Sequence, residues 1–242
     1  MALAWSGCSR GSDVQAAVAH RMAGVQYAAA GDYDQALAEF NQAIQIAPNY
    51  AAAYLDRGKL FYDTERYDLA IADFTQALTL DPKLAVAYGQ RGNAYAVLEN
   101  HSQAVSDYSS ALSLAPEMSA LWFNRGVCYT KMGQFQSAVE DFDKAEALGF
   151  KTTWLFFNRG LAYANLDDEL KAINEFTQAI ELDPTNYEAV FNRGVLNYRN
   201  QRYEAARSDF ENYLSLQPTA SNRPQVEQWL QSIDAQLSEG GS

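Results

Sequence analysis

A glycine recurs every 34 residues along most of the 242-residue chain, and this spacing constrains the fold more than any other feature of the sequence. The six glycines are Gly24, Gly58, Gly92, Gly126, Gly160 and Gly194. A fixed interval of this length is typical of repeat proteins, in which each repeat is one supersecondary unit that needs its neighbours to bury an apolar face. The period therefore predicts a stacked array instead of one or two ordinary globular domains.

Three further residue types keep the same period. Twelve residues after each glycine stands an alanine: Ala36, Ala70, Ala104, Ala138, Ala172 and Ala206. Four residues further stands an aromatic residue: Phe40, Phe74, Tyr108, Phe142, Phe176 and Phe210. Proline closes five of the six repeats: Pro48, Pro82, Pro116, Pro184 and Pro218. The small residues let two helices approach closely, because larger side chains would push the axes apart, and proline ends the second helix because its ring clashes with continued helix.

Together these positions resemble the signature of the tetratricopeptide repeat family over about residues 17–220. The resemblance implies an all-α fold, a right-handed α-solenoid of tandem helix–turn–helix repeats. We expect repeats at 17–50, 51–84, 85–118, 119–152, 153–186 and 187–220, after an N-terminal tail at 1–16. Residues 221–242 are expected to form a C-terminal capping helix and a flexible end, because Pro224 follows polar capping residues and apolar residues then recur at helical spacing. We expect Trp229 of this helix to pack against the sixth repeat.

The fourth repeat departs from the pattern at its end. Phe150 stands where the other repeats have proline, and Gly149 precedes it. Glycine is the residue that most often ends a helix in the left-handed conformation. We therefore expect Gly149 to end the helix in place of proline. The alternative is that the chain has a hinge at this point.

Composition and motifs argue against several classes of function. The formal net charge is −12, whereas nucleic-acid binding needs a basic surface. The chain has two cysteines and two histidines, with no metal-type spacing, phosphate-binding loop or nucleophile motif. No apolar stretch approaches the ~20 residues of a membrane-spanning helix. We therefore expect no enzyme activity, cofactor, metal, small-molecule substrate or nucleic-acid partner.

The resemblance implies that one arc of each first helix lines a concave groove. Numbering each repeat from its first residue, positions 2, 5, 6, 9, 12 and 13 form this groove arc, because they lie opposite the packing face at about 100° per residue. The candidate partner-binding residues on it are Gln90, Phe123, Asn124, Trp154, Phe157, Asn158, Phe191, Asn192 and Tyr198. An amide side chain can donate and accept, so it can pair with a peptide backbone of any sequence. The alternatives are that the asparagines only satisfy neighbouring helices and that the phenylalanines only pack between repeats.

Position 7 carries an arginine in repeats two to six, and position 23 carries an acid in every repeat. The arginines are Arg57, Arg91, Arg125, Arg159 and Arg193, and the acids in those repeats are Asp73, Asp107, Asp141, Glu175 and Asp209. Residues that recur in step predict structural ion pairs more than ligand contacts. The first repeat has Ala23 at position 7, so Glu39 is expected to lack a partner.

One binding mode of relatives can be tested on the sequence. Repeats that clamp the C-terminal carboxylate of chaperones have basic and asparagine residues at defined groove positions. The first such window here reads Arg21, Val25, Asp56, Val86 and Gln90, and only Arg21 matches. A chaperone-tail co-chaperone is therefore disfavoured.

The N-terminal segment leaves the cellular location open. A short apolar run followed by Ser6-Gly7-Cys8 resembles the end of a bacterial lipoprotein signal, although the run is too short for a complete signal and lacks a basic start. If Cys8 carries lipid, the solenoid is anchored to a membrane. On the chain as written, a cytoplasmic location is expected.

The leading hypothesis is a non-enzymatic scaffold or adaptor that binds a protein or peptide segment in its groove and assists complex assembly. Repeats four to six carry the most regular groove residues, so the segment is expected there. The alternative is a lipid-anchored or self-associating structural subunit that acts through its convex face or its ends.

Overall fold

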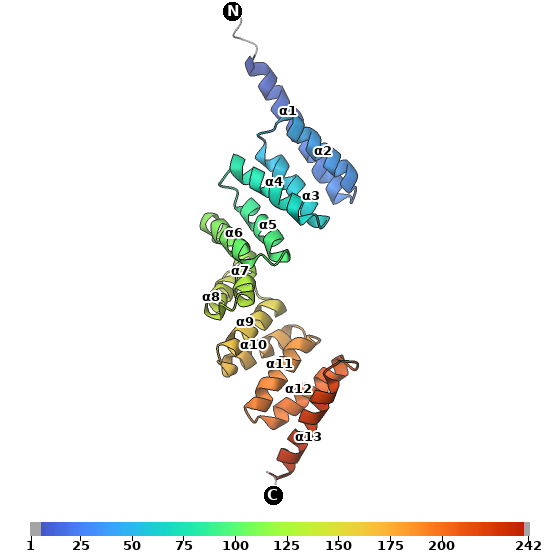
Figure 1. The fold of residues 1–242 in the computed structure, drawn as a ribbon, viewed down its shortest axis with the longest axis vertical. Coiled ribbons are helices and arrows are strands. Elements are labelled where there is room, and N and C mark those ends of the chain that lie inside the picture. Colours follow the sequence, from blue (N-terminus) through green and yellow to red (C-terminus); the bar gives the residue numbers. More distant parts are fainter. Residues whose placement is uncertain (1–5, 240–242) are drawn as a thin grey trace, which may run out of the picture. The chain divides into compact units, whose positions relative to one another are not determined.

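The computed structural model describes residues 6–239, with side chains for residues 13–238, and this part of the chain is all-helical. Figure 1 shows its thirteen helices in chain order. They are α1 (Ser6–Ala29), α2 (Tyr33–Ile46), α3 (Ala51–Asp63), α4 (Tyr67–Leu80), α5 (Ala85–Val97), α6 (His101–Leu114), α7 (Ser119–Lys131), α8 (Phe135–Ala147), α9 (Thr153–Asn165), α10 (Glu169–Leu182), α11 (Tyr187–Arg199), α12 (Tyr203–Leu216) and α13 (Arg223–Glu239). The predicted all-α solenoid of tandem helix–turn–helix repeats is confirmed.

The chain divides into two compact units, Met1–Cys128 and Tyr129–Ser242, and the boundary lies within α7. In the first unit, α1 pairs with α2, α3 with α4 and α5 with α6, while α2 packs on α3 and α4 on α5. In the second unit, α9 pairs with α10 and α11 with α12, while α8 packs on α9 and α10 on α11. Each unit is thus a stack of antiparallel hairpins.

The periodic glycine permits the close approach within each hairpin. A Cβ atom on Gly58 of α3 would lie 2.7 Å from the ring of Phe74 on α4, and one on Gly160 of α9 would lie 2.8 Å from the ring of Phe176 on α10. Both rings are fully buried. Since carbon atoms normally approach to about 3.5–4.0 Å, only glycine allows the ring to rest directly on the helix backbone.

The turn inside each hairpin uses one residue in the left-handed conformation. The six residues, all at position 15 of their repeats, are Gly31, Glu65, Glu99, Gly133, Asp167 and Gln201, with φ between 57° and 80°. Four of them are not glycine, although this region is costly for residues with a Cβ atom. The turn is therefore imposed by the packing of the two helices and not by the local sequence alone.

The end of repeat four confirms the predicted glycine terminator. Gly149 follows α8 with φ of 90°. Its N–H donates to Glu146 O at 2.8 Å, and the N–H of Phe150 donates to Ala145 O at 3.0 Å. This pair of bonds is the Schellman motif, which satisfies the last carbonyls of a helix.

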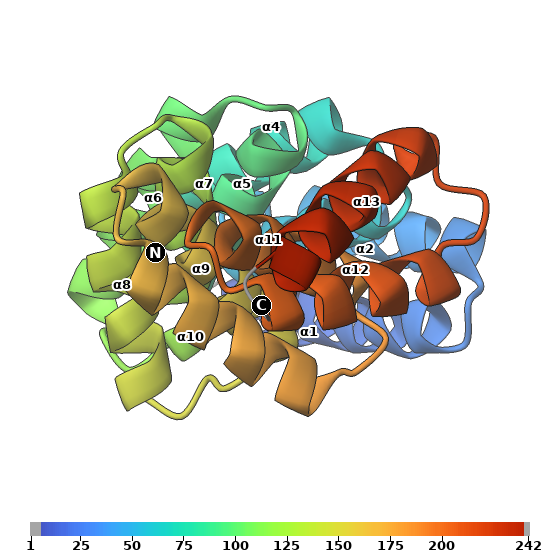
Figure 2. The same cartoon turned by 90° about the horizontal axis from the view of Figure 1, so that it is seen from below.

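The last helix, α13, packs on α12, and the two views in Figures 1 and 2 show it beside that helix. Val226 and Ile233 of α13 are fully buried. The ring of Trp229 stacks on Phe210 of α12 with centroids 5.3 Å apart. The expectation that Trp229 packs against the sixth repeat is confirmed.

The first helix is longer than the repeat requires. It begins at Ser6, eleven residues before Ala17, so much of the segment that we expected to be a tail at 1–16 is helical. The side chain of Cys8 lies outside the described residues, so its lipidation stays a prediction. Among the helices of residues 6–239, none is long and apolar enough to span a membrane.

Candidate partner-binding surface

The periodic arginines are held by acids of their own repeats. Nε and Nη2 of Arg57 donate to the two carboxylate oxygens of Asp73, both at 2.7 Å. The pairs Arg91–Asp107 and Arg193–Asp209 have the same geometry, with bonds of 2.6–3.1 Å. These bonds confirm the predicted structural pairing for the three arginines, whose planar fork suits two parallel bonds.

The remaining guanidinium nitrogen of each arginine, Nη1, reaches the second helix of the preceding repeat. Nη1 of Arg91 donates to Thr75 Oγ1 at 2.9 Å, and Nη1 of Arg193 donates to Thr177 Oγ1 at 3.1 Å. Arg125 makes the equivalent bond to Ser109 at 2.9 Å. Arg91 and Arg193 therefore each connect three helices, which leaves little of either side chain for a partner.

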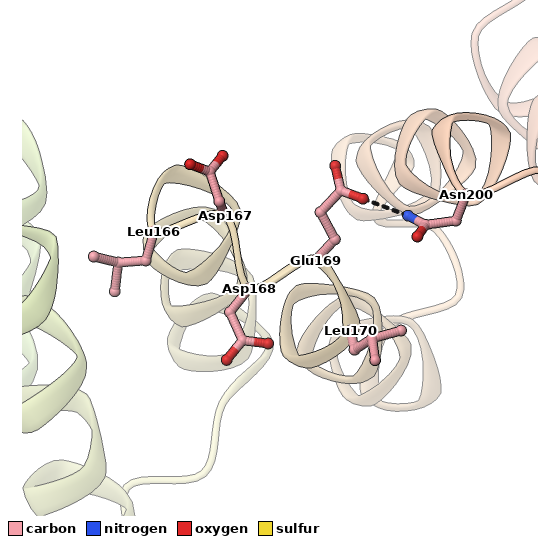
Figure 3. Close-up of a pocket in the computed structure, with 6 residues that line it drawn as sticks. All are labelled: Leu166, Asp167, Asp168, Glu169, Leu170 and Asn200. Carbon is pink, nitrogen blue, oxygen red and sulfur yellow. Dashed lines mark hydrogen bonds between the residues drawn. The ribbon is translucent and has the colours of Figure 1, made fainter.

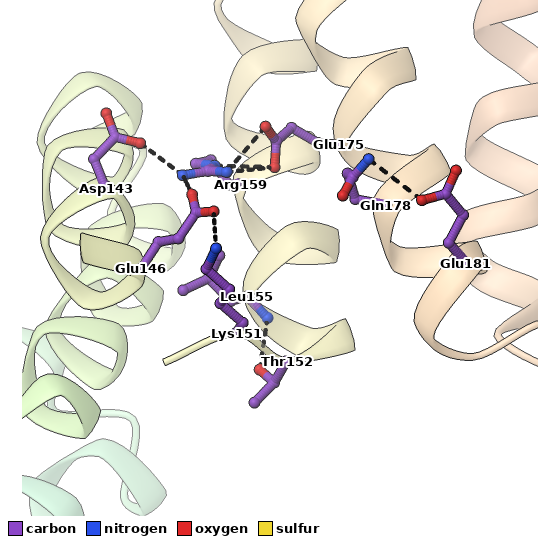
Figure 4. A network of polar contacts seen from close by, with 9 residues as sticks. All are labelled: Asp143, Glu146, Lys151, Thr152, Leu155, Arg159, Glu175, Gln178 and Glu181. Carbon is purple, nitrogen blue, oxygen red and sulfur yellow. Dashed lines mark hydrogen bonds and ion pairs between the residues drawn. The ribbon is translucent and has the colours of Figure 1, made fainter. Parts of the chain in front are cut away.

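Arg159 carries a larger version of this network (Figure 4). It donates to Glu175 of α10 at 2.9 and 3.1 Å, and its Nη1 lies 2.7 Å from both Asp143 and Glu146 of α8. Burial by itself lowers the pKa of Arg159, but the hydrogen bonds to Glu175 and Glu146 outweigh it, and the pKa is raised. Burial raises the pKa of Glu175, against the effect of Arg159. Within the described part of the chain, Arg159 therefore has three carboxylate partners, whereas Arg57, Arg91 and Arg193 each have one.

The expectation for repeat one is wrong in one respect. Glu39 has a partner, because His20 Nδ1 lies 2.7 Å from Glu39 Oε2. His20 stands three residues before Ala23, almost one helical turn, so its ring reaches the acid that the arginine reaches in the other repeats.

Arg21, which alone matched the chaperone-tail pattern, is occupied within the chain. Its Nε donates to Asp56 Oδ2 at 2.6 Å and its Nη1 donates to the hydroxyl of Tyr50 at 3.1 Å. Burial alone lowers the pKa of Arg21, and the hydrogen bond to Asp56 raises it above its usual value. The side chain therefore links the first repeat to the second.

In the first unit, the groove-arc amides form a network between repeats three and four. Asn124 Nδ2 donates to Asn93 Oδ1 at 3.0 Å, and the hydroxyl of Tyr108 donates to the same oxygen at 2.8 Å. Asn93 Nδ2 in turn lies 3.5 Å from Gln90 Oε1. Phe123, beside Asn124, is half-buried. The amide of Asn124 therefore has the inter-repeat contact that we considered as an alternative to peptide binding.

In the second unit, the groove-arc asparagines bond to their own helices. Asn158 Nδ2 donates to Trp154 O at 2.7 Å, and Asn192 Nδ2 donates to Glu188 O at 2.7 Å. Because only the NH₂ end of an amide can pair with a carbonyl, this bond fixes which way each amide faces. No residue described by the structure donates to Oδ1 of either asparagine, so each keeps an acceptor half-exposed at the surface.

The groove-arc aromatics differ strongly in exposure. Phe157 is 9% exposed and rests against Phe176, with centroids 5.9 Å apart. Phe191 and Tyr198 are half-buried, and their ring centroids lie 6.2 and 6.1 Å from that of Trp229. The structure therefore uses these three predicted residues largely for packing.

Trp154 is the exception among the groove-arc aromatics. Its side chain is 57% exposed at the start of α9, and its ring meets that of Phe157 edge-on at 6.3 Å. An exposed tryptophan is unusual, since this side chain carries a large apolar area that normally finds a partner. Trp154 is the most accessible of the predicted contact residues.

An acidic hollow between the fifth and sixth repeats was not predicted from the sequence (Figure 3). Asp167, Asp168 and Glu169 line it with Asn200, whose Nδ2 donates to Glu169 Oε2. Leu170, also in its lining, is 61% exposed. Among the described side chains, no group of three or more His, Cys, Asp or Glu residues is arranged to hold a metal ion. The hollow is therefore a polar surface feature with one exposed leucine at its edge.

Models of one protein family match the repeats along most of the chain. Models described as "TPR repeat" or "Tetratricopeptide repeat" match residues 24–64, 51–84, 85–118, 119–148 and 157–221. No curated protein sequence matches the chain.

Several solved structures share the fold. YrrB, described as a TPR protein with an unusual peptide-binding site, is 26% identical and covers 78% of this chain and 97% of its own, with a TM-score of 0.71. PilF of Pseudomonas aeruginosa is 19% identical and covers 93% of this chain and 99% of its own, also with a TM-score of 0.71. MamA is 22% identical, with coverage of 72% and 95% and a TM-score of 0.65.

Proposed function

Because the chain belongs to the tetratricopeptide repeat family, whose members are typically protein-interaction scaffolds, we propose that it is a non-enzymatic scaffold that holds an extended segment of a partner protein on its groove arc. The segment lies in the second unit, against α9 and α11. Binding there assists the assembly of a complex that contains the partner.

The exposed ring of Trp154 carries this proposal. It offers a partner a rigid apolar surface at the start of the groove arc of repeat five, and tryptophan is among the residues that most often dominate binding energy. Phe157 supports the ring from the side and is itself buried. A hydrophobic side chain of the partner therefore packs on Trp154.

The asparagines hold the backbone of the segment. Asn158 and Asn192 each present Oδ1 to the surface, as their amide nitrogens are bound to their own helices. A peptide N–H can donate to each oxygen, whatever the side chain of that peptide residue. Phe191 and Tyr198, packed against Trp229, form the floor next to Asn192.

The first unit offers a second, smaller contact surface of the same kind. Gln90 and Asn124 belong to the amide network around Asn93, and Phe123 lies beside them. Since these amides already bond to each other, their rearrangement would oppose binding, and we expect the first unit to contribute less. The similarity to YrrB, a repeat protein with a peptide-binding site, supports peptide recognition in general.

The test compares partner capture by matched variants. Trp154→Ala and the double change Asn158→Ala/Asn192→Ala remove the proposed contacts. Asn174→Ala is the control, since Asn174 is an exposed asparagine on the second helix α10, away from the groove arc. Proteins captured from the native source are quantified by mass spectrometry for each variant.

Loss of the same captured proteins in both groove variants, with full capture by the control, supports the proposal. Equal capture by all variants rejects the groove arc of the second unit as the binding surface. Thermal unfolding of each variant shows whether a loss of capture reflects a loss of folding instead.

A further inference from the structure

Position 11 of the first helix changes character in the last repeat. Five repeats carry an aromatic residue there: Tyr27, Phe61, Tyr95, Tyr129 and Tyr163. The sixth repeat carries Asn197. Asparagine is much smaller than a phenyl or phenol ring, so the space that the ring fills in an earlier repeat must be closed by movement or left open.

Repeat two shows how a buried ring at this position is held. Phe61 is 8% exposed and belongs to a core cluster against which Leu37 of the preceding repeat packs. The guanidinium groups of Arg57 and Arg66 lie over its ring, 5.7 and 4.7 Å from the centroid. In repeat five a cation again covers the ring, with Lys171 Nζ 5.0 Å from the centroid of Tyr163. In these two repeats the slot at position 11 therefore holds an aromatic ring under a positive charge, which is an arrangement favoured by the ring quadrupole.

Repeat six keeps the walls of this slot without the ring. Ile173, Arg193 and Arg202 stand at the positions of Leu37, Arg57 and Arg66. All three line a surface pocket of about 360 Å³, together with Asn197. A cavity of about 150 Å³ is enough to admit benzene, so the pocket has room for an aromatic side chain.

The polar groups of the pocket favour a phenol over a plain phenyl ring. Asn197 is 4% exposed, and its Nδ2 donates to Asp209 Oδ2 at 3.0 Å. This bond fixes the amide, since only its NH₂ end can donate to a carboxylate. No described residue donates to Oδ1 of Asn197, and none forms an ion pair with Arg202, an exposed residue. Beside Thr177, Ser208 and Asp209, the pocket therefore offers an acceptor on Asn197 that no described residue occupies, and Arg202 offers a cation for a ring face.

We propose that this pocket is a second docking site, which receives a tyrosine side chain of a partner protein in the place of the missing position-11 ring. The phenol ring lies under Arg202 and its hydroxyl donates to Asn197 Oδ1. The site is built from positions 7, 11 and 16 of repeat six and from α10, and none of these residues belongs to the groove arc. It therefore does not depend on peptide binding at Trp154.

The test uses p-cresol, the isolated side chain of tyrosine, as the probe. Amide shifts of the ¹⁵N-labelled chain are followed during titration with p-cresol and, in parallel, with 4-methylcyclohexanol, which has a similar shape but no aromatic ring. We expect saturable shifts at Ala205 and Ser208, which also line the pocket, with p-cresol and at least about tenfold weaker binding of the cyclohexanol.

Three variants separate the pocket from other surfaces. Asn197→Phe restores the ring of the other repeats, so we expect it to fold and to lose p-cresol binding. Arg202→Gln removes the cation from an exposed position and should weaken binding about threefold. Arg199→Gln removes an equal charge from an exposed position that does not line the pocket and should have no effect.

The proposal is overturned if p-cresol causes no saturable shifts at Ala205 and Ser208, or if Asn197→Phe binds p-cresol as well as the wild type. Equal binding of p-cresol and 4-methylcyclohexanol would show an unspecific apolar pocket and would also reject it. Shifts confined to Asn158 and Asn192 would place the probe on the groove arc, which rejects the pocket without affecting the proposed function.

Discussion

Replacing Gly58 with alanine sets two opposite effects against each other. Alanine is favoured over glycine inside a helix by about 1 kcal/mol. Against this, the new Cβ atom would lie 2.7 and 2.8 Å from two carbons of the Phe74 ring, where about 3.5–4.0 Å is normal. The ring is fully buried and must move by roughly 1 Å, and overpacking of this kind typically costs about 1–3 kcal/mol. We therefore expect Gly58→Ala to lower the free energy of unfolding by about 1 kcal/mol.

Urea unfolding followed by circular dichroism measures this change. Repeat arrays do not always unfold in one step, so the comparison requires an unchanged dependence of the free energy on urea. A double-mutant cycle with Phe74→Leu isolates the clash, because a smaller side chain leaves room for the methyl group. We expect the two changes to couple favourably by about 1 kcal/mol. If Gly58→Ala stabilised the protein, or if the two changes were additive, close packing would not be the reason for the periodic glycine.

Three further predictions concern the described side chains and turns. Asp107→Asn leaves Arg91 without a carboxylate and should lower the free energy of unfolding in urea by about 2–4 kcal/mol. Glu175→Gln should lower it by roughly half as much, because Arg159 keeps two other acids, and equal losses would contradict the network geometry. Gly133→Ala should cost about 1 kcal/mol through the backbone alone, since its φ is 73° and nothing lies within 4 Å of the added methyl group; an unchanged midpoint would refute this. Burial raises the pKa of the Cys128 thiol to about 11. In a Cys8→Ser background, a thiol reagent at pH 8.5 should therefore react with Cys128 only when urea unfolds the chain. Rapid labelling of the native protein would contradict this, because it would show that the thiol is accessible.

The sequence was sufficient to predict the fold because each periodic residue performs a local task. The glycine at position 8 admits a ring, and the arginine at position 7 reaches an acid sixteen residues later. Gly149 could be identified as a terminator for the same reason, since its role depends only on the backbone of its own helix end. A local structural role of this kind can be predicted from the sequence of one repeat, and the recurrence of the residue in the other repeats supports the prediction.

The contact residues were harder to predict because exposure depends on neighbours that the period does not specify. Phe191 and Tyr198 occupy groove-arc positions, yet Trp229 of the non-repeat helix α13 covers them. The register of α13 contains a signal: Val226 and Ile233 are seven residues apart, as are the buried Ala189 and Leu196 of α11. This spacing predicts one apolar face along α13, and that face packs on the last hairpin.

Positions that keep the period and positions that break it carry different information. A residue that recurs in five or six repeats, such as the arginine at position 7, contacts residues at equivalent positions each time, and these contacts use its hydrogen-bonding groups. A residue that stands alone at its position has no such explanation. Trp154 at position 2 and Asn197 at position 11 are both of this kind, and one leaves a large ring exposed while the other leaves a pocket. Since a partner must distinguish one repeat from the next, its specificity has to come from these departures. That both lie in the second unit is the physical reason for placing the binding surfaces there.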